Sequence, residues 1–505
     1  MSRKSDPTAP DEPAPVTEQD AHDAAELAHL GYAQQLLREL GGFGNFAVSF
    51  SVISVLTGAV SLYGYGLRYG GPFGVIVGWA LVATLTLPVA ASLAQLASSF
   101  PTAGALYHWS SWLGGRGTGW LTAWLNLLGQ FAITAGIDWG LTEFLVPPSW
   151  AASAGLRLVV YAAVLGTHAV LNHVGIRTVN LLAWVSAWYH VVGVALVVGT
   201  VALLAPHRPV DFLLDRTVDA SVALPPGAGY GYAFLVSLLM AGWTFTGYDA
   251  SAHVSEETHD AARSAPRGIF LSVLVSAVCG GLLVLAVTLS LREPARVADP
   301  AAVGFAVALD QAFPGRAWLA RALTWLAMGA MWFCGLASLT SNSRMIFAFA
   351  RDGGMPLSAR FARVSQRYQT PADAVWLSAG GAFGVAFLCL GYGALGGEAV
   401  ADVLGRITAA STVWLYLSYG LPIAAGLWAR RGGRWRERGP WDLGRASHGV
   451  NLIALAWIAT LSVISSLPPN GFVAWLLAVA LLGLGLYWWL AVRHRFRGPP
   501  ELPRG

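Results

Sequence analysis

The fold of this 505-residue chain is decided by the stretch Tyr230-Gly-Tyr-Ala-Phe-Leu-Val-Ser-Leu-Leu-Met-Ala-Gly-Trp-Thr-Phe-Thr-Gly-Tyr-Asp-Ala-Ser-Ala-His253. It is apolar and long enough to cross a bilayer as a helix, which takes roughly 20 residues. Its middle, near residues 242–249, is rich in Gly, Ser and Thr and contains one acid, Asp249. Small residues in such a place predict either close helix packing or an interrupted helix.

A second stretch has the same character, Phe43-Gly-Asn-Phe-Ala-Val-Ser-Phe-Ser-Val-Ile-Ser-Val-Leu-Thr-Gly-Ala-Val-Ser-Leu-Tyr-Gly-Tyr-Gly66, with a candidate interruption near residues 54–58. The two stretches are the first and sixth of the apolar runs, so we expect them to cross the membrane in opposite directions. An inverted repeat with broken first helices has this arrangement. Freed N–H groups at a break attract a carboxylate, and freed carbonyls attract an ammonium or a cation. Paired interruptions therefore predict a site for a zwitterion.

The rest of the chain predicts an all-α polytopic membrane protein with 12 transmembrane helices. Hydrophobic residues make up 55% of the chain and charged residues 11%, against about 25% charged residues in ordinary soluble domains. No run shows the alternation of a barrel strand. The candidate spans are residues 43–66, 73–98, 118–146, 155–174, 178–205, 229–254, 268–291, 318–348, 372–392, 404–428, 449–467 and 472–492.

The arginines predict the orientation of these spans in the plasma membrane. Most of them, including those of 430–438 and 493–497, fall in the connections that lie inside when both termini are cytoplasmic, as the positive-inside rule requires. The leucines between Leu27 and Leu40 predict an amphipathic helix on the inner surface, after a disordered tail. The expected parts are a cytoplasmic N-terminal tail with this helix (1–41), a first repeat of spans 1–5 (42–205), a second repeat of spans 6–10 (206–428), and spans 11–12 with the cytoplasmic C-terminus (429–505).

Several functional classes are not expected. Cys279, Cys334 and Cys389 each lie in an apolar run without CxxC spacing, which predicts neither a disulfide framework nor a metal site. No phosphate-binding loop or nucleophile motif occurs, so we expect no enzyme, no ATP-driven step and no cofactor. The arginines are spread among loops rather than gathered in one stripe, which argues against a nucleic-acid partner.

Five groups of residues carry a resemblance to a known family. They are Leu30-Gly-Tyr-Ala-Gln-Gln-Leu-Leu-Arg38 running into 45–58, Phe100-Pro-Thr-Ala-Gly-Ala-Leu-Tyr-His-Trp109, Trp188-Tyr-His-Val-Val-Gly193, Thr246-Gly-Tyr-Asp-Ala-Ser-Ala-His-Val-Ser-Glu-Glu-Thr258 with Ala265-Pro-Arg-Gly-Ile269, and Thr340-Ser-Asn-Ser-Arg344 with Phe347-Ala-Phe-Ala-Arg-Asp-Gly353. On these residues the chain resembles the amino acid–polyamine–organocation permeases, and within them the amino acid/choline transporter branch that includes GABA permeases. The resemblance implies a LeuT-like 5+5 inverted repeat followed by two C-terminal helices.

The resemblance also implies roles for individual residues. The substrate carboxylate would meet the unwound part of span one, and the span-six pattern Trp-x-Phe-x-Gly-x-acid would place an aromatic gate, Trp243, and an acid, Asp249, at the second break. The substrate-binding residues expected on this basis are Ser54, Leu56, Thr57, Gly58, Trp243, Phe245, Gly247 and Asp249.

Further polar residues lie within the predicted spans, where ionisable groups are costly and often functional. Asp138 in span three is expected near the outer vestibule, either holding a substrate ammonium or as an interfacial group. His190 in span five would carry a coupling proton, since histidine titrates near pH ~6.5, or be a buried neutral histidine. Ser338 and Ser341 in span eight would offer oxygens to Na⁺ beside span one, or satisfy backbone carbonyls.

The function predicted from these features is secondary active transport of an amino acid or GABA-like amine by alternating access. The coupling ion would be H⁺, or Na⁺. One alternative keeps the fold and changes the substrate to choline or a polyamine, held in an aromatic cage of Trp243, Phe245 and Tyr248. The other is a nutrient sensor or channel. Gln95 stands where many relatives carry an acid and Lys4 is the one lysine, so coupling through an acid in span two or a lysine in span five is not expected.

Overall fold

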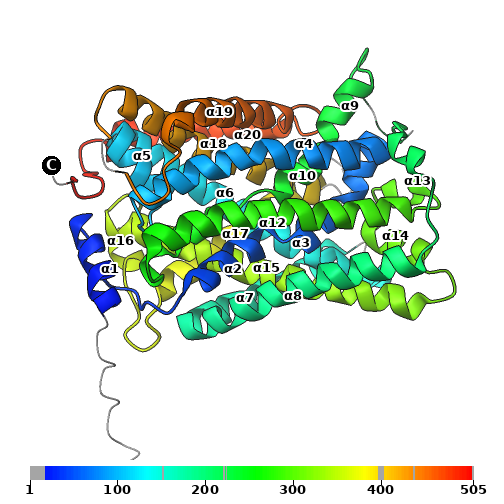
Figure 1. Cartoon of the computed structure of the whole chain (residues 1–505), viewed down its shortest axis with the longest axis horizontal. Helices are drawn as coiled ribbons and strands as arrows, with labels where there is room; N and C mark the ends of the chain where they lie inside the picture. The colour runs from blue at the N-terminus through cyan, green and yellow to red at the C-terminus, as the bar shows by residue number, and fades with distance from the viewer. Residues whose placement is uncertain are drawn as a thin grey trace, which may run out of the picture.

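The computed structural model describes residues 18–150, 153–219, 222, 224–395, 403–435 and 438–502. These residues form a bundle of helices whose axes follow the long direction of the molecule (Figure 1). Within these ranges the one strand-like pairing is an isolated bridge between Leu40 and Thr258. The tail expected to be disordered falls largely in residues 1–17, outside the described residues.

The helices follow the predicted apolar runs. The long ones are α4 (Tyr63–Ser99), α6 (Arg116–Leu145), α7 (Ala154–Val174), α8 (Ile176–Leu204), α12 (Ala261–Leu289), α15 (Ala317–Arg351), α17 (Ala372–Leu395), α18 (Val403–Arg431), α19 (Ser447–Ile464) and α20 (Phe472–Tyr487), which the π-helical turn Trp488–Val492 extends. The central broken ones are α2 (Gly42–Ile53), α3 (Val55–Ser61), α9 (Tyr230–Ser237), α10 (Leu239–Thr244) and α11 (Ala250–His253). Shorter peripheral helices are α1 (Glu18–His29), α5 (Leu106–Gly114), α13 (Pro294–Ala298), α14 (Gly304–Ala312) and α16 (Ser358–Phe361), with 3₁₀ turns at Pro148–Trp150, Val210–Leu214, Ser255–Glu257 and Gly444–Ala446.

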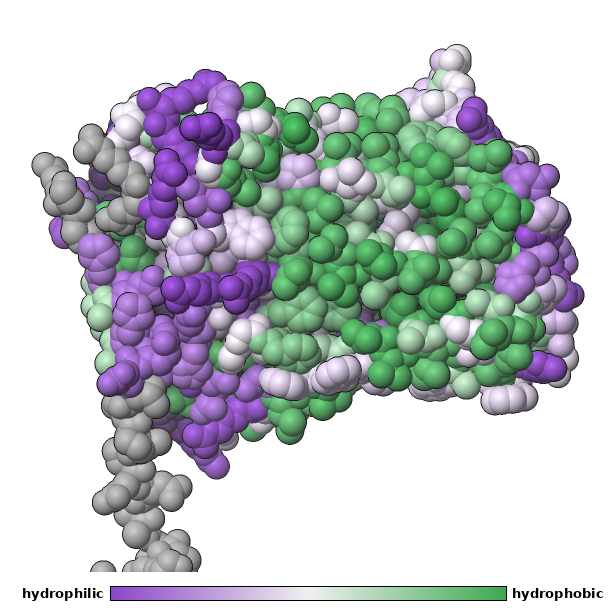
Figure 2. All heavy atoms as spheres, viewed as in Figure 1, coloured by the Kyte–Doolittle hydropathy of each residue, from purple (hydrophilic) through white to green (hydrophobic). Residues whose placement is uncertain are grey.

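The bundle has the surface of a membrane protein. Among the described residues, nine helices are long and apolar enough to cross a membrane. α6 and α18, with 30 and 29 residues, are long enough to cross a membrane but are not in this set. Figure 2 shows an apolar belt over the visible face of the bundle and polar surface at its two ends. The chain is therefore an all-helical, multi-pass membrane protein.

The N-terminal segment differs from the predicted amphipathic helix over residues 27–40. α1 ends at His29, and residues 30–41 continue as irregular chain along one end of the bundle. Leu27, Leu36 and Leu40 are at most 2% exposed, because they pack against the protein rather than a lipid surface. Leu40 also accepts a hydrogen bond from the backbone N–H of His259 at 2.9 Å. The buried leucines thus attach residues 30–41 to the bundle as an irregular segment, which we call the strap. The prediction of a surface helix over residues 27–40 is wrong.

Both described ends of the chain lie at the same end of the bundle, near α1 and α5 (Figure 1). The indole N–H of Trp112 in α5 donates to the carbonyl of Pro500 at 2.8 Å. An even number of crossings brings the two ends together in this way. We call this the terminal end of the bundle, and the end near α13 and α14 the opposite end.

The broken helices occupy the centre of the bundle. α2 packs against α8, α12 and α15, while α3 and α10 pack against each other. Long helices surround them, so the breaks are shielded from the apolar belt. This placement matters because backbone groups freed by a break must find partners within the protein.

Candidate functional site at two broken helices

The first break is a single residue, Ser54. Its backbone has φ 17° and ψ 92°, between the end of α2 at Ile53 and the start of α3 at Val55. The break is narrower than the stretch 54–58 expected from the sequence, because residues 56–58 are helical and belong to α3. The predicted residues are therefore the first turn of a helix rather than unwound chain.

This first turn leaves two backbone donors free. The carbonyl of Ser54 accepts from the N–H groups of Thr57 at 2.8 Å and Gly58 at 2.9 Å. Val55 and Leu56 are the first two residues of α3, so their N–H groups have no carbonyl partner within that helix. Two unsatisfied donors at the start of a helix are suited to an anionic group.

His190 of α8 anchors the first break. Its Nε2 lies 2.7 Å from the hydroxyl of Ser54, and its Nδ1 lies 2.8 Å from the backbone carbonyl of Ser186. A carbonyl only accepts hydrogen bonds, so Nδ1 carries the proton and Nε2 accepts from Ser54. This arrangement satisfies a neutral imidazole, which was the structural alternative for His190. Its role as a carrier of the coupling proton remains a prediction.

The second break spans residues 245–249, inside the predicted stretch 242–249. Gly247 has φ +82°, a conformation that favours glycine. A Cβ built on it would also lie 2.3 Å from Cγ1 of Val52. Gly247 is thus required both by the backbone of this break and by the close approach of α2.

Two tyrosines of α18 satisfy the backbone of the second break. The hydroxyl of Tyr416 donates to the carbonyl of Phe245 at 2.9 Å. The hydroxyl of Tyr419 accepts from the N–H of Gly247 at 3.0 Å. Since unpaired backbone groups cost several kcal/mol in lipid, these hydroxyls help to explain how the second break persists inside the bundle. The sequence signal for them is only that tyrosine occurs inside an apolar span.

The two broken stretches hold each other. The hydroxyl of Ser49 in α2 donates to the carbonyl of Tyr248 and accepts from the N–H of Ser251, both at 2.8 Å. Beyond the breaks, a Cβ on Gly58 would lie 2.4 Å from the hydroxyl oxygen of Thr244 and 2.7 Å from its Cα. α3 and α10 therefore meet at a contact that only glycine allows.

A void of about 10 Å³ lies between the two breaks, lined in part by Thr57, Gly58, Trp243 and Cys334. It holds about one water molecule and must widen to take a larger molecule. The indole N–H of Trp243 has no partner among the described residues. The structure thus brings together three of the predicted site residues in a closed arrangement.

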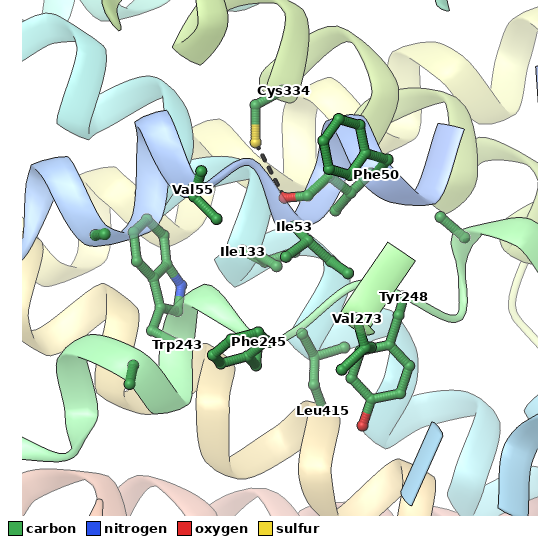
Figure 3. Packing of buried hydrophobic residues seen from close by; sticks show 14 of the residues in the cluster. Phe50, Ile53, Val55, Ile133, Trp243, Phe245, Tyr248, Val273, Cys334 and Leu415 are labelled. Carbon is green, nitrogen blue, oxygen red and sulfur yellow. Dashed lines mark hydrogen bonds between the residues drawn. The ribbon is translucent and has the colours of Figure 1, made fainter. Parts of the chain in front are cut away.

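The three aromatic residues of the second break do not face one space. Phe245 packs on Trp79 with ring centroids 4.9 Å apart, and Tyr248 packs near Tyr419 at 5.1 Å. In the view of Figure 3, Leu415 lies between the rings of Phe245 and Tyr248. The observed arrangement is not an aromatic cage.

Asp249 is fully buried and faces other protein groups rather than the void. Its Oδ1 accepts from the hydroxyl of Tyr419 at 2.8 Å. Its Oδ2 lies 3.2 Å from Nδ2 of Asn126, 3.4 Å from Nε2 of Gln130 and 3.2 Å from Nε2 of His253. The acid therefore links the second break to α6 and α18.

Asp138 does not lie at the outer vestibule as expected. It is fully buried, with Oδ2 3.2 Å from Nδ1 of His168 in α7. A Cβ on Gly335 of α15 would lie 2.2 Å from its Oδ1. Asp138 is four residues before Thr142, whose hydroxyl donates to its carbonyl at 2.8 Å. Its position in the seam between α6, α7 and α15 separates it from the void.

The two predicted serines of α15 have different surroundings, and their role in binding Na⁺ stays a prediction. The Ser338 hydroxyl lies 2.7 Å from that of Thr134 in α6, while the buried Ser341 hydroxyl has no partner among the described residues. Across those residues, no group of three or more His, Cys, Asp or Glu side chains is placed to hold a metal ion.

A cavity of about 760 Å³ opens at the opposite end of the bundle. Its lining includes Ser61 at the end of α3 and the ion pair of Glu143 with Arg157. Ser61 is three residues beyond Gly58, so the cavity reaches toward the void along α3. This end of the site is the more open one.

Two buried ion pairs close the terminal end. Arg344 of α15 makes a two-pronged contact with Glu257 at 2.9 and 3.0 Å, with both side chains fully buried. Arg351 contacts Glu256 in the same way at 2.8 and 2.9 Å. Burial alone would raise the pKa of Glu256, but Arg351 outweighs it and holds that pKa below its usual value. Arg267 is exposed and belongs to neither pair.

A second cluster joins the strap to this closed end. The hydroxyls of Tyr32 and Tyr107 donate to Oδ2 of Asp352 at 2.7 and 2.9 Å, and Nε2 of His108 lies 3.2 Å from the same oxygen. Burial would raise the pKa of Asp352, but the hydrogen bonds from His108 and Tyr32 and the charge of Arg351 hold it below its ordinary value. The carboxylate of Asp352 thus holds together the strap, α5 and the end of α15.

Gln95, at the position where an acid was expected from relatives, links two other elements. Its Nε2 lies 2.6 Å from Oδ1 of Asp442, and its Oε1 accepts from the hydroxyl of Ser447 at 2.9 Å. The contact joins α4 to the connection between α18 and α19.

Comparison with known proteins identifies related sequences. Residues 41–487 match the family model described as amino acid permease. The chain is 34% identical over 506 aligned residues to a protein of Oryza sativa subsp. japonica named amino-acid permease BAT1 homolog, with 94% of this chain and 95% of that one covered. It is 33% identical to amino-acid permease BAT1 of Arabidopsis thaliana, with the same coverage. The GABA-specific permease of Saccharomyces cerevisiae is 27% identical over 387 residues, with 73% of this chain and 66% of that one covered.

Proposed function

The chain belongs to the amino acid permease family, and we propose that it moves an amino acid or GABA-like amine across the plasma membrane by H⁺-coupled secondary active transport. The observation that carries this proposal is the pair of breaks in the centre of the bundle. The helices beside them meet at a small void lined by Thr57 and Gly58 on one side and Trp243 on the other, and α3, which carries Thr57 and Gly58, begins with the N–H groups of Val55 and Leu56. A related protein is named a GABA-specific permease, which supports an amine-bearing acid as the substrate.

The proposed architecture is twelve spans arranged as a 5+5 inverted repeat with two added helices. The first half, residues 42–205, would run from α2 to α8, and the second half, residues 206–428, from α9 to α18. The remaining residues, 429–505, would form α19, α20 and the cytoplasmic C-terminus. In each half the first crossing is the broken one, as in transporters built from inverted repeats. Both termini would be cytoplasmic, with residues 1–41 as the N-terminal tail.

The substrate carboxylate would bind at the start of α3. The free N–H groups of Val55 and Leu56 provide two donors, and the hydroxyls of Ser54 and Thr57 lie beside them. Gly58 keeps this turn close to α10, and Trp243 would cover the bound molecule as a gate. Phe245, Gly247 and Asp249 shape the second break from behind rather than contacting the substrate in the closed state.

The closed arrangement would be one state of an alternating-access cycle. The cavity of about 760 Å³ is the path from the outside, and the buried ion pairs of Glu256 and Glu257 block the path to the cytoplasm. Opening inward would require those pairs to separate while the outer cavity closes. Each buried pair costs several kcal/mol to expose or break, so the blocked end is stable until substrate and ion binding favour the other state.

Uptake into proteoliposomes tests this function. Purified protein should accumulate radiolabelled GABA or another amino acid above its external concentration when the outside is acidic, and a protonophore should abolish the accumulation. Na⁺ in place of the pH gradient should not restore it. Accumulation of choline or spermidine alone would contradict the proposal and favour the organocation alternative, although the separated rings of Trp243, Phe245 and Tyr248 argue against an aromatic cage. Uptake that only equilibrates would favour a channel.

A further inference from the structure

We propose that His253 and Asp249 share a bound proton, and that this proton fastens the cytoplasmic half of span six to the turn between α4 and α5. The role of this proton in coupling rests on the function proposed above. The pair of His253 and Asp249 gives the coupling proton a place in the structure. The histidine of this pair carried no role in the sequence analysis.

The two nitrogens of His253 have partners that decide its protonation. Nδ1 lies 2.9 Å from the backbone carbonyl of Ala103, and Nε2 lies 3.2 Å from Oδ2 of Asp249. A carbonyl only accepts, so Nδ1 must carry a hydrogen. The imidazole of His253 and the carboxyl of Asp249 are both fully buried, so no bulk water takes the place of either partner.

The contact between Nε2 and Oδ2 then requires one more proton. If the imidazole were neutral and Asp249 ionised, the lone pair of Nε2 would face an anionic oxygen at 3.2 Å with no hydrogen between them. A proton on either atom turns this repulsion into a hydrogen bond, as an imidazolium with a carboxylate or as a neutral imidazole with a carboxylic acid. The pair is neutral overall in both forms, which suits a site without solvent.

The other groups around Asp249 favour the ionic form. Tyr419 donates to Oδ1, and Asn126 and Gln130 of α6 direct their amide nitrogens at Oδ2. With His253 as a fourth donor, the carboxylate would accept at about four lone-pair sites, which matches its capacity. Tyr248 is the other titratable neighbour, and no arginine of the described residues forms an ion pair with Asp249.

Among the described residues three other histidines are buried, and the two in α7 and α8 lack this requirement. His190 bonds a carbonyl and a serine hydroxyl, which satisfies a neutral ring. His168 directs Nδ1 at Asp138, and its Nε2 has no partner in the described part of the chain. A neutral ring that donates from Nδ1 satisfies that contact. Compared with His168 and His190, His253 alone is placed between a fixed acceptor and a carboxylate.

The proton is placed where the cytoplasmic path must open. Ala103 lies in the turn between α4 and α5, and its N–H also donates to Oε1 of Glu256 at 3.1 Å. Span six therefore holds this turn at two points, through His253 and through Glu256. When the turn moves away, His253 loses its carbonyl partner and gains water, which can then accept the proton on the cytoplasmic side. The proton taken up from the acidic outer side would thus leave on the inner side.

Nitrogen-15 NMR of the full-length protein tests the shared proton without reference to transport. Protein labelled at its histidines is measured in nanodiscs at pH 7.5 without substrate. We expect a doubly protonated ring that disappears in His253→Asn and persists in His207→Asn, a matched control in an exposed loop. An infrared band of a protonated carboxyl that Asp249→Asn removes would be the other form of the same shared proton. A singly protonated His253 beside an ionised Asp249 would overturn the proposal. If His253→Asn does not fold, His253→Gln serves as the second variant.

Transport measurements test the coupling separately. Counterflow of radiolabelled GABA needs no proton gradient, whereas accumulation driven by an acidic outside does. His253→Asn should lose accumulation at least about tenfold relative to counterflow. A parallel loss of both would make His253 merely structural and overturn its coupling role. If wild-type accumulation ignores the pH gradient, the proposed H⁺ coupling fails, and the NMR result still decides whether the pair holds a proton.

Discussion

Replacement of Gly58 by alanine probes the contact between the two broken helices. The added Cβ would lie 2.7 Å from Cα of Thr244 and 2.4 Å from its hydroxyl oxygen. Because the clash includes the backbone Cα of Thr244, a side-chain rotation cannot relieve it, and α3 and α10 must separate by roughly 1 Å. Overpacking of this kind costs about 1–3 kcal/mol, which exceeds the gain of up to about 1 kcal/mol that alanine brings to a helix.

Two further glycines supply matched controls. Gly166 in α7 has no neighbouring atom within 4 Å of an added Cβ, so Gly166→Ala should be neutral or stabilising by up to about 1 kcal/mol. At Gly136 the added Cβ would lie 3.1 Å from the ring of Trp243, a side chain that is able to shift. We therefore expect Gly166→Ala to be the most stable of the three variants, Gly136→Ala to be intermediate and Gly58→Ala to be the least stable.

The assay is thermal unfolding of the three purified variants in one detergent, followed by uptake in proteoliposomes. Gly58→Ala should unfold at the lowest temperature and should weaken apparent substrate affinity, because the turn that carries the free N–H groups is displaced. Equal stability and equal half-saturation for Gly58→Ala and Gly166→Ala would refute the close contact and its part in the site.

Three other perturbations follow from the described contacts. Arg344→Met leaves Glu257 buried without its partner and should lower stability by about 3–5 kcal/mol. The double variant that also carries Glu257→Gln should recover part of this stability. An unchanged unfolding temperature of Arg344→Met would count against the buried pair. Tyr419→Phe removes the hydroxyl between the N–H of Gly247 and Asp249 and should cost about 1–3 kcal/mol, whereas Tyr487→Phe should cost little, since that hydroxyl has no partner among the described residues. The pKa values of Asp352 and Glu256 are lowered in the folded protein. Both carboxylates therefore stabilise the fold fully above the usual carboxyl pKa of about 4, and this stabilisation is lost as the pH falls through the lower folded values. The unfolding temperature should therefore drop between pH 5 and pH 3, and less steeply for Asp352→Asn; an identical slope would exclude Asp352 as a contributor.

The sequence was sufficient for the parts of the fold that depend on local composition. Apolar runs predicted the helices, and the Gly-rich middle near residues 242–249 predicted a break that the structure places at residues 245–249. The break in span one could be located only approximately. Ser, Gly and Thr are spread from Ser49 to Gly58, and nothing local distinguishes Ser54, whose position depends on His190 from a helix more than 130 residues away.

Side chains whose role depends on distant partners could not be assigned from the sequence. Asp138 was expected near solvent because it lies toward one end of its span, but His168 and Gly335 bury it in a helix seam. Leu27 to Leu40 have a spacing that fits an amphipathic helix, yet backbone contacts with His259 and its neighbours hold that segment as a strap. Tertiary contacts override local periodicity in such segments.

The position of a bound substrate tests the central claim most directly. A cryo-EM map of the full-length protein, saturated with the amino acid that the uptake panel selects, should show density between the start of α3 and Trp243. The carboxylate should lie within hydrogen-bonding distance of the N–H groups of Val55 and Leu56. Density confined to the outer cavity or to the seam beside Asp138, with the void between the two breaks still closed, would contradict the account.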